Sequence, residues 1–353
     1  MLRRIIAAGS AAAGLVVAGA LAPAVAAPTD PAPVKVLSVS ATSVTLKPHH
    51  TVSIKVTAKL SRALVGEEEA DVIVGPHEAT GPDELGIDEL TPTSVPTTLT
   101  TTFTVPDSVR PGLWDVEAAV FADSKAEDPS AYSDATFHVK LPTALKVDAG
   151  PEPAAVGESL TVTGTLTRYG QSTGRYASYS GRKVDVYFDP AGSAPRTKVG
   201  TATTDASGRF TRKVTARTTG VWSAEYAGST YYAGVRSAGD TVAVVKKKTR
   251  LSVNASPEPV KKGAKVTVAG RLTHATSVRG TLHYTSYPHK TLTVWFDPAG
   301  PKGASQVAAV TTSSSGTYSV KRTQAVAGTW SVRFAATPSY AASAGKDAVA
   351  VTK

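Results

Sequence analysis

The chain has 353 residues, with 38 Lys and Arg, 28 Asp and Glu, and no cysteine. This length suits two or three domains of ordinary size, and the lack of cysteine excludes disulfides, thiolate zinc sites, iron–sulfur clusters and a lipoprotein anchor. The chain is rich in Gly and Pro, and no long stretch has the 3.6-residue period of an amphipathic helix. We therefore expect short strands joined by turns.

The N-terminus has the three parts of a secretory signal peptide. These are the basic start Met1–Arg4, an apolar run to Leu21 and the small-residue site Ala24-Val25-Ala26. We expect cleavage before Ala27. The alternative is an uncleaved membrane anchor, which the helix-breaking Pro23 disfavours. The sequence thus predicts a secreted, extracellular protein that has no membrane attachment after cleavage.

Charge is distributed unevenly along the chain. Residues 28–141 hold 8 Lys and Arg against 17 Asp and Glu, a net charge of −9, whereas residues 142–246 carry +5 and residues 247–353 carry +12. Such opposite charges would attract the two ends within or between molecules, or would draw the basic end to an anionic polymer. The alternative is that these charges form solvated surfaces without a partner.

A strand that carries tryptophan occurs three times. The pattern Gly-x-Trp-x-[Val/Ala] surrounds Trp114, Trp222 and Trp330, and alternate residues after each Trp are apolar. A period of two with one apolar face is typical of a half-buried strand, so each Trp is predicted to lie in the core of its own β domain. The predicted organisation is a signal peptide (1–26), a flexible leader (27–33), an acidic domain (34–141) and two basic domains (143–246 and 249–353).

The acidic domain contains a long acidic loop, 78–96, which has no side-chain period. Its paired acids at 78–90 would offer oxygen ligands to calcium. Because they lack regular Asp-x-Asp spacing, we favour a solvated loop and predict no metal site. The expected strands of this domain are Val36–Val39, Ser43–Leu46, Val52–Ala58, Ala70–Val74, Thr98–Val105, Leu113–Phe121 and Ala135–Val139.

The two basic domains repeat one another. Pro151-Glu152-Pro153 matches Pro257-Glu258-Pro259 at an offset of 106 residues, and 186–192 matches 294–300 at an offset of 108. A repeat of this length is one domain of sandwich size rather than a solenoid unit. Because the linkers between the domains are short, we expect a semi-rigid rod.

The central domain has turn signals about every ten residues, which favours an antiparallel sandwich of two sheets. The stretch 203–210 (Thr-Thr-Asp-Ala-Ser-Gly-Arg-Phe), Gly220-x-Trp222 and Tyr231-Tyr232 together resemble the bacterial Ig-like repeats of secreted actinobacterial proteins, and are also similar to transthyretin-like modules. The seven expected strands are Leu145–Ala149, Leu160–Thr167, Lys183–Asp189, Lys198–Thr204, Gly208–Thr215, Val221–Tyr226 and Thr241–Val245.

This resemblance covers residues 143–353 and implies the fold without implying an activity. The C-terminal domain departs from the pattern at Ser313, which replaces the turn Asp, and the acidic domain shares only the Gly-x-Trp strand. The predicted fold class is all-β, with three tandem antiparallel Ig-like β-sandwich domains.

The sequence contains no catalytic motif, such as a Gly-x-Ser-x-Gly elbow, a His-Glu-x-x-His pair or a phosphate-binding Gly loop. We therefore predict that the protein is not an enzyme and has no catalytic residue and no cofactor. His274, His283 and His289 share one predicted loop, where we expect solvated side chains rather than metal ligands.

Tyrosines in loops are the stronger signal. In an Ig-type sandwich the loop after the second strand and the loop after the sixth share one end, and both basic domains carry Tyr in these loops. Tyr with Ser, Gly and Arg makes a paratope-like surface; the alternative is that Tyr pins a long loop onto the sandwich. The predicted ligand-binding residues are Tyr169, Arg175, Tyr176, Tyr179, Tyr231, Tyr232, Tyr284, Tyr287, Trp295 and Tyr340.

Trp295 differs from the other candidates because it lies on a predicted strand. If Val294 and Phe296 face the core, Trp295 faces outward, as Tyr187 does in the central domain. Such a ring is either a ligand platform or a contact between modules, and we favour the module contact. The predicted core residues are Trp114, Trp222, Trp330, Phe188 and Phe296.

These features predict a secreted, non-catalytic interaction or spacer protein that binds a cell-wall polysaccharide or a surface protein through its Tyr/Arg loops. The alternative function is a hydrolase or hydrolase inhibitor with an unrecognised site. We expect a monomer, with no nucleic-acid partner.

Overall fold

The computed structural model describes residues 32–77, 85–126, 128–278 and 281–353. The predicted signal peptide lies outside these residues, as do most of the predicted leader and residues 78–84 of the predicted acidic loop. Within the described residues all regular structure is strand, and the long strand pairs are antiparallel. The predicted all-β, antiparallel fold class is therefore confirmed.

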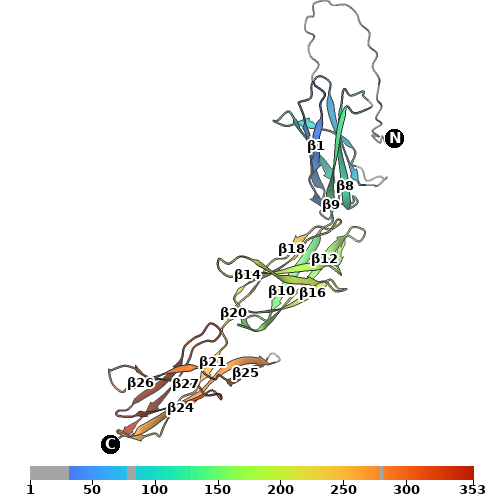
Figure 1. Cartoon of the computed structure of the whole chain (residues 1–353). Coiled ribbons are helices and arrows are strands. Elements are labelled where there is room, and N and C mark those ends of the chain that lie inside the picture. Colours follow the sequence, from blue (N-terminus) through green and yellow to red (C-terminus); the bar gives the residue numbers. More distant parts are fainter. Residues whose placement is uncertain (1–31, 78–84, 127, 279–280) are drawn as a thin grey trace, which may run out of the picture.

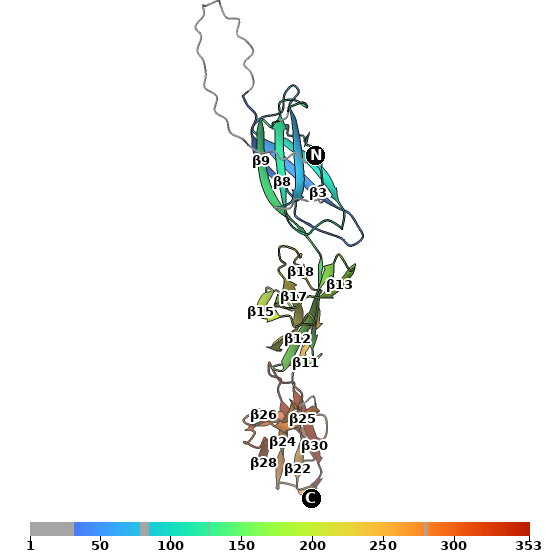
Figure 2. The ribbon, with the colours of Figure 1, turned by 90° about the vertical axis from the view of Figure 1, so that its right-hand side faces the viewer.

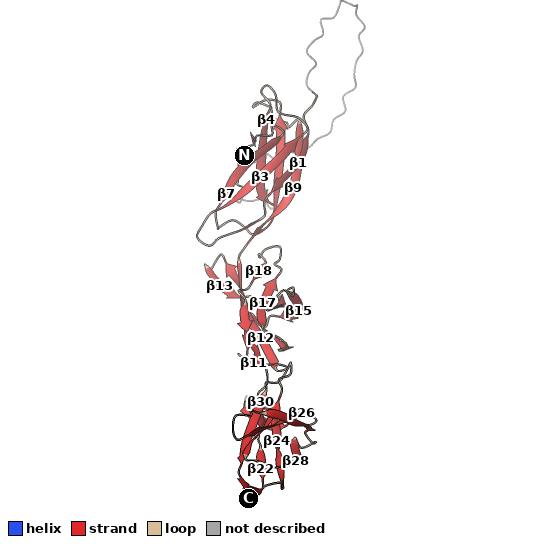
Figure 3. Cartoon of the chain, turned by 90° about the vertical axis from the view of Figure 1, so that its left-hand side faces the viewer, coloured by secondary structure: helices blue, strands red, loops and turns tan. Residues whose placement is uncertain are grey.

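Buried apolar side chains form three separate clusters, which define an N-terminal, a central and a C-terminal module. The modules follow one another in an elongated molecule (Figures 1, 2 and 3). Trp114, Trp222 and Trp330 are buried, one in each cluster. Phe188 and Phe296 are half-buried and pack on Trp222 and Trp330, with ring centroids 4.6 and 4.7 Å apart.

The N-terminal module consists of two sheets with the orders β1-β3-β7-β6 and β2-β9-β8-β4-β5. Ile54, Val56 and Ala58 of β3 are buried and alternate with more exposed residues, as expected for a strand with one core face. Its strands are β1 (Val36–Ala41), β2 (Val44–Thr45), β3 (Val52–Leu60), β4 (Glu69–Pro76), β5 (Ile87–Glu89), β6 (Thr91–Pro92), β7 (Thr98–Val105), β8 (Gly112–Phe121) and β9 (Ala131–Lys140).

In the central module β12 pairs with β10, β13 and β16 in one sheet, and the other sheet has the order β15-β14-β17-β18, with β19 also on β17. Two sheets of this connectivity are an Ig-like sandwich. Its strands are β10 (Thr143–Gly150), β11 (Ala154–Ala155), β12 (Ser159–Gly170), β13 (Arg175–Ser178), β14 (Lys183–Pro190), β15 (Thr197–Thr203), β16 (Arg209–Thr215), β17 (Gly220–Tyr226), β18 (Val235–Arg236), β19 (Asp240–Val242) and β20 (Val244–Val245).

The C-terminal module repeats this plan. β24 pairs with β21, β22, β25 and β28, and the second sheet has the order β27-β26-β29-β30. Its strands are β21 (Thr249–Leu251), β22 (Asn254–Ser256), β23 (Val260–Lys261), β24 (Lys265–Val278), β25 (Thr281–Ser286), β26 (Thr291–Pro298), β27 (Ser305–Thr311), β28 (Thr317–Thr323), β29 (Gly328–Phe334), β30 (Ser343–Val349) and β31 (Val351–Thr352).

Three predicted loops contain strands, and one of them is the loop predicted to hold His274, His283 and His289, in which His274 lies on β24 and His283 on β25. The segment expected to be the loop after Thr167 is a hairpin, in which β12 continues to Gly170 and turns back as β13, so that Tyr169 lies opposite Tyr176. In the segment 78–96, the described part includes β5, which pairs with β4. A short strand at a sheet edge forms because it pairs with the neighbouring strand, so its own sequence need not alternate between apolar and polar residues.

Candidate functional site

The N-terminal and central modules are joined almost directly. β9 ends at Lys140 and β10 begins at Thr143, and Leu141 between them is buried. The N–H of Leu141 donates to the carbonyl oxygen of Tyr231 at 2.8 Å, and its own carbonyl accepts a 2.8 Å hydrogen bond from the N–H of Ala233. The connecting residue is thereby hydrogen-bonded to the central module.

Three of the predicted binding tyrosines lie at this junction. Tyr169 is only 5% exposed and belongs to the apolar cluster of the N-terminal module. Tyr232 packs against the clusters of both modules. The ring of Tyr231 lies over Gly112, so that a side chain at position 112 would place its Cβ only 3.2 Å from the Cε1 atom of Tyr231. Tyr231 nevertheless remains 55% exposed. These rings contact the neighbouring module.

Gln171, which sequence reasoning did not single out, completes the junction. Its side-chain Nε2 donates to the backbone carbonyls of Asp107 at 2.7 Å and Val109 at 2.8 Å, both in the N-terminal module. The carboxylate of Asp107 accepts a 2.6 Å hydrogen bond from the N–H of His49. The tip of the β12–β13 hairpin is therefore anchored by specific hydrogen bonds.

Tyr179 is buried at the centre of an aromatic cluster within the central module. Its ring packs on Tyr226 and Tyr232, at centroid distances of 5.7 and 5.0 Å, and the guanidinium groups of Arg168 and Arg182 lie 5.1 and 4.5 Å from its centroid. Burial, together with the hydrogen bond to Tyr179, raises the pKa of Tyr226 to about 12, so its hydroxyl is neutral at physiological pH. This cluster holds the hairpin against the sandwich.

Arg175 and Tyr176 remain on the exposed side of the hairpin. The ring of Tyr176 meets Tyr169 edge-on at 5.5 Å. Of the six predicted binding side chains in the central module, Arg175, Tyr176 and Tyr231 thus stay exposed, whereas Tyr169, Tyr179 and Tyr232 are buried or partly buried in contacts within the protein.

In the C-terminal module the corresponding aromatic cluster is formed by residues of that module alone. Tyr287 is buried and packs on Tyr340 at 4.5 Å and on His274 at 4.9 Å, and Lys290 lies 4.9 Å from its ring centroid. Lys247 occupies the position that corresponds to Leu141: its N–H donates to Ser339 and its carbonyl accepts from Ala341, each at 2.9 Å. The backbone arrangement is repeated, with a charged residue in the place of an apolar one.

Tyr284 on β25 is a half-buried tyrosine outside this cluster. The guanidinium of Arg250 lies 3.7 Å from its ring centroid, a cation–π contact. Arg250 and the neighbouring His283 are exposed. Among the described residues, no carboxylate forms an ion pair with either of them. Arg250 was absent from the predicted site, since only the pairing of β21 and β25 with β24 brings it to Tyr284.

Trp295 faces outward from β26 and is half-buried. Arg333 of β29 lies 4.4 Å from its ring centroid, and its indole N–H donates to the Thr293 hydroxyl at 3.0 Å, so both contacts are within its own module. In the central module the equivalent ring is that of Tyr187, and the guanidinium of Arg196 lies 3.7 Å from its centroid. On both sheet faces an arginine thus stacks on an aromatic ring, but the two arginines differ in the acidic residues available to pair with them.

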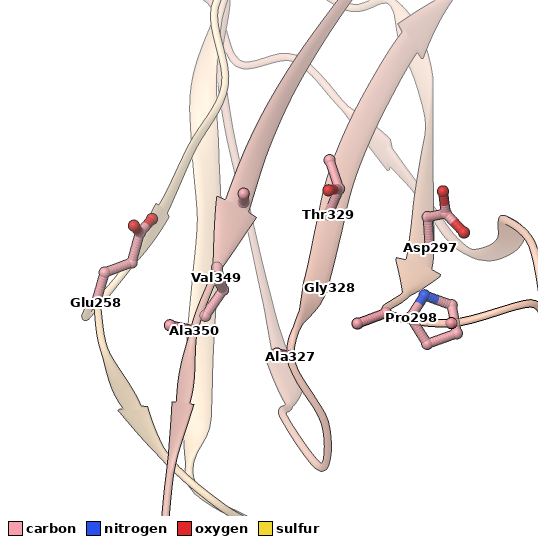
Figure 4. A pocket seen from close by; sticks show the side chains of 11 residues that line it. Glu258, Asp297, Pro298, Ala327, Gly328, Thr329, Val349 and Ala350 are labelled. Carbon is pink, nitrogen blue, oxygen red and sulfur yellow. The ribbon is translucent and has the colours of Figure 1, made fainter.

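A shallow hollow lies at the far end of the C-terminal module (Figure 4). Glu258 and Asp297 flank it, and Ala327, Gly328 and Thr329 line it between them. Burial, with the neighbouring Asp347 carboxyl group, raises the pKa of Glu258. The lining residues include no His, Cys, Lys or Arg.

Groups of three or more metal-ligating side chains are not found within the part of the chain that the structure describes. Nor is there, in the same part, a helix long and apolar enough to cross a membrane.

No protein-family model matches the sequence, and no curated protein matches it. Solved structures that are similar include three N-terminal domains of the highly immunogenic outer capsid protein of bacteriophage RB49 (TM-score 0.34, 10% identity, 91% of this chain and 99% of that chain). Others are the ectodomain of mouse nectin-like molecule 4 (0.29, 9%, 88% and 97%) and a marsupial T cell receptor (0.25, 14%, 89% and 98%). At these low TM-scores, the assignment of the fold rests on strand topology.

Proposed function

We propose that the protein is a secreted, non-catalytic spacer and interaction protein that binds an anionic cell-wall polysaccharide through its C-terminal module. The observation that carries this proposal is the Arg250–Tyr284 pair, which is accessible on a module whose sequence has a net charge of +12. An aromatic ring offers a flat apolar face to a sugar, and a guanidinium offers forked donors to a carboxylate or phosphate.

The spacer role follows from the first junction. Tyr169 and Gln171 fix the N-terminal module to the central one through burial and hydrogen bonds. Among the described residues, the hydrogen bonds of the corresponding β24–β25 hairpin go to the C-terminal module itself and to Lys248, and none goes to the central module. We infer that the β24–β25 hairpin, which is the counterpart of the anchoring β12–β13 hairpin, is free to contact an external ligand.

The proposal is tested by sedimenting the mature chain, from Ala27, with insoluble anionic cell-wall polymer and with neutral chitin, at low and high salt. The decisive variant is Arg250→Ser/Tyr284→Ser, and the matched control is Arg175→Ser/Tyr176→Ser in the central hairpin. We expect binding to the anionic polymer to be lost in the first variant and kept in the control. Equal binding of both variants, or no binding by the wild type, would overturn the proposal.

A further inference from the structure

The outer face of the sheet β27-β26-β29-β30 carries cations for which the described residues provide no ionic partner. Two adjacent rows of directly paired residues cross its four strands: Gln306, Trp295, Ser331, Lys346 and Ala309, Thr293, Arg333, Ala344. We call these eight residues the cationic face. Arg333 and Lys346 are exposed, and the described residues provide neither side chain with a hydrogen bond or an ion pair.

The central module shows what this face looks like when its charges are paired internally. There the equivalent strands carry Asp185 and Glu225, and Glu225 forms an ion pair of 2.9 Å with Arg196. Asp185 pairs with Lys198 at 2.7 Å. In the C-terminal module Thr293 and Arg333 stand in the places of Asp185 and Glu225. Both of these acids are replaced here while the aromatic–arginine stack is kept, so the two rows of the cationic face contain no carboxylate and have positive charge to offer to another molecule.

The opposite charge lies on the outer face of the N-terminal module. Two adjacent rows cross β9, β8, β4 and β5: Tyr132, Ala119, Asp71, Glu89 and Asp134, Glu117, Ile73, Ile87. We call these eight residues the acidic face. It contains four carboxylates and no Lys or Arg. Ile87 and Tyr132 are 62% and 51% exposed, so apolar surface is available beside the carboxylates.

The carboxylates of the acidic face repel one another. Burial, followed by the charges of Glu69 and Glu89, raises the pKa of Asp71, and burial with the charges of Asp134 and Asp115 raises the pKa of Glu117. Like charges directly opposite on neighbouring strands destabilise a sheet. A cationic partner would relieve this repulsion.

We propose that the cationic face binds the acidic face of a second copy of the chain, so that molecules associate head to tail. The two faces are on modules at opposite ends of the described rod (Figures 1 and 2), with the central module between them, and the stiff first junction keeps them apart within one molecule. Contact between different patches of successive copies is heterologous, and such contacts form rings where the rotation between copies closes and open chains where it does not.

The size of the faces sets the strength of the contact. Four strands about 4.8 Å apart and about seven residues long give a flat face of roughly 20 by 20 Å. This is smaller than one side of a standard stable interface, which buries about 800 Å² per partner. The association is therefore weak and depends on charge, with Arg333 making forked hydrogen bonds to carboxylates and Trp295 covering apolar surface. It uses a surface different from the Arg250–Tyr284 pair.

The test is sedimentation velocity of the mature chain over a range of concentrations. At low salt we expect the weight-average mass to rise with concentration beyond that of a dimer. In about 1 M salt, where the Debye length is about 3 Å, this rise should disappear. One variant, Arg333→Glu/Lys346→Glu, reverses the cationic face, and another, Glu117→Lys/Asp134→Lys, reverses charge on the acidic face. Each alone should weaken association at least about tenfold, as a loss of about 1.4 kcal/mol implies.

An equimolar mixture of the two reversed variants decides the matter, because each then offers the charge that the other lacks. We expect association to return in the mixture. The control variant Lys265→Glu/Lys321→Glu changes the charge of the C-terminal module by the same amount, but on the other sheet of the sandwich. It should associate more strongly than Arg333→Glu/Lys346→Glu. A mass that is constant at low salt, equal weakening by the control, or no recovery in the mixture would overturn the inference. Binding of the cationic face to anionic polysaccharide in place of a second copy would also overturn it, and leaves the proposed function standing.

Discussion

The side-chain amide of Gln171 donates a 2.8 Å hydrogen bond to the backbone carbonyl of Val109, across the boundary between two modules. The same nitrogen reaches the carbonyl of Asp107. Because Val109 is itself buried in the N-terminal core, the hairpin tip is fixed to a part of that module that cannot move freely. The two modules should therefore behave as one mechanical unit.

Replacing Gln171 by Ala should loosen this unit. Two hydrogen bonds are lost, at about 0.5–1.5 kcal/mol each, and two carbonyls lose their partner. We expect the N-terminal module to unfold at a lower temperature than in the wild type, while the C-terminal module is unaffected. Calorimetry measures this, with the exposed neighbour variant Ser172→Ala as control. An unchanged thermogram would show that the junction contributes nothing.

The second junction should bend more than the first. Lys247 and Ala275 stand where Leu141 and Tyr169 stand at the first junction, so the apolar contact that Tyr169 makes with the neighbouring module has no counterpart there. The chain has no cysteine, so pairs of introduced cysteines can carry spin labels. We expect a broad distance distribution between the central and C-terminal modules and a narrow one between the N-terminal and central modules. Equal widths would contradict this difference, and Tyr169→Ala should broaden the narrow one.

The central core depends on Trp222, whose ring packs on Phe188. Large-to-small substitution of such a residue costs about 3–5 kcal/mol, so Trp222→Ala should unfold the central module at a much lower urea concentration. Val245→Ala, at an exposed position of the same module, serves as a control for loss of an apolar side chain that is not in the core. Near-wild-type stability of the Trp222 variant would mean that the strand is placed wrongly.

Removing one charge from the acidic face should stabilise the N-terminal module. Glu117 lies directly opposite Asp134, and its pKa is raised by burial and then by Asp134 and Asp115. A raised folded-state pKa means that the ionised form destabilises the fold, so stability falls as pH rises through that pKa. Glu117→Gln should therefore gain about 0.2–1 kcal/mol at about pH 7, and this gain should fade towards pH 4. A gain that does not depend on pH would exclude the electrostatic cause.

The turn before β28 should become more stable when it carries the aspartate found in the equivalent turn of the central module. Asp205 accepts hydrogen bonds from the Ser207 hydroxyl and from the N–H groups of Ser207 and Arg209, and these bonds lower its pKa. Ser313 occupies that position in the C-terminal module. Ser313→Asp should raise the melting temperature of this module near neutral pH, and the gain should disappear as pH falls through the lowered pKa. Ser314→Asp at the adjacent exposed position should have no such effect.

The sequence by itself determined the all-β class and the three tryptophan-bearing strands, because a period of two and turn residues are local signals. The burial of Trp114, Trp222 and Trp330 follows from the same alternation. It also determined the charge difference between the ends of the chain, since charge is a property of composition.

Only the tertiary structure decided what the aromatic residues contact. Tyr169 and Tyr176 are equivalent as sequence signals, yet one is buried against the neighbouring module and the other is exposed. Arg250 and Arg333 reach Tyr284 and Trp295 only because distant strands pair in one particular register. Cross-strand neighbours are set by this register and by how modules dock, which are long-range contacts that no local pattern of residues records.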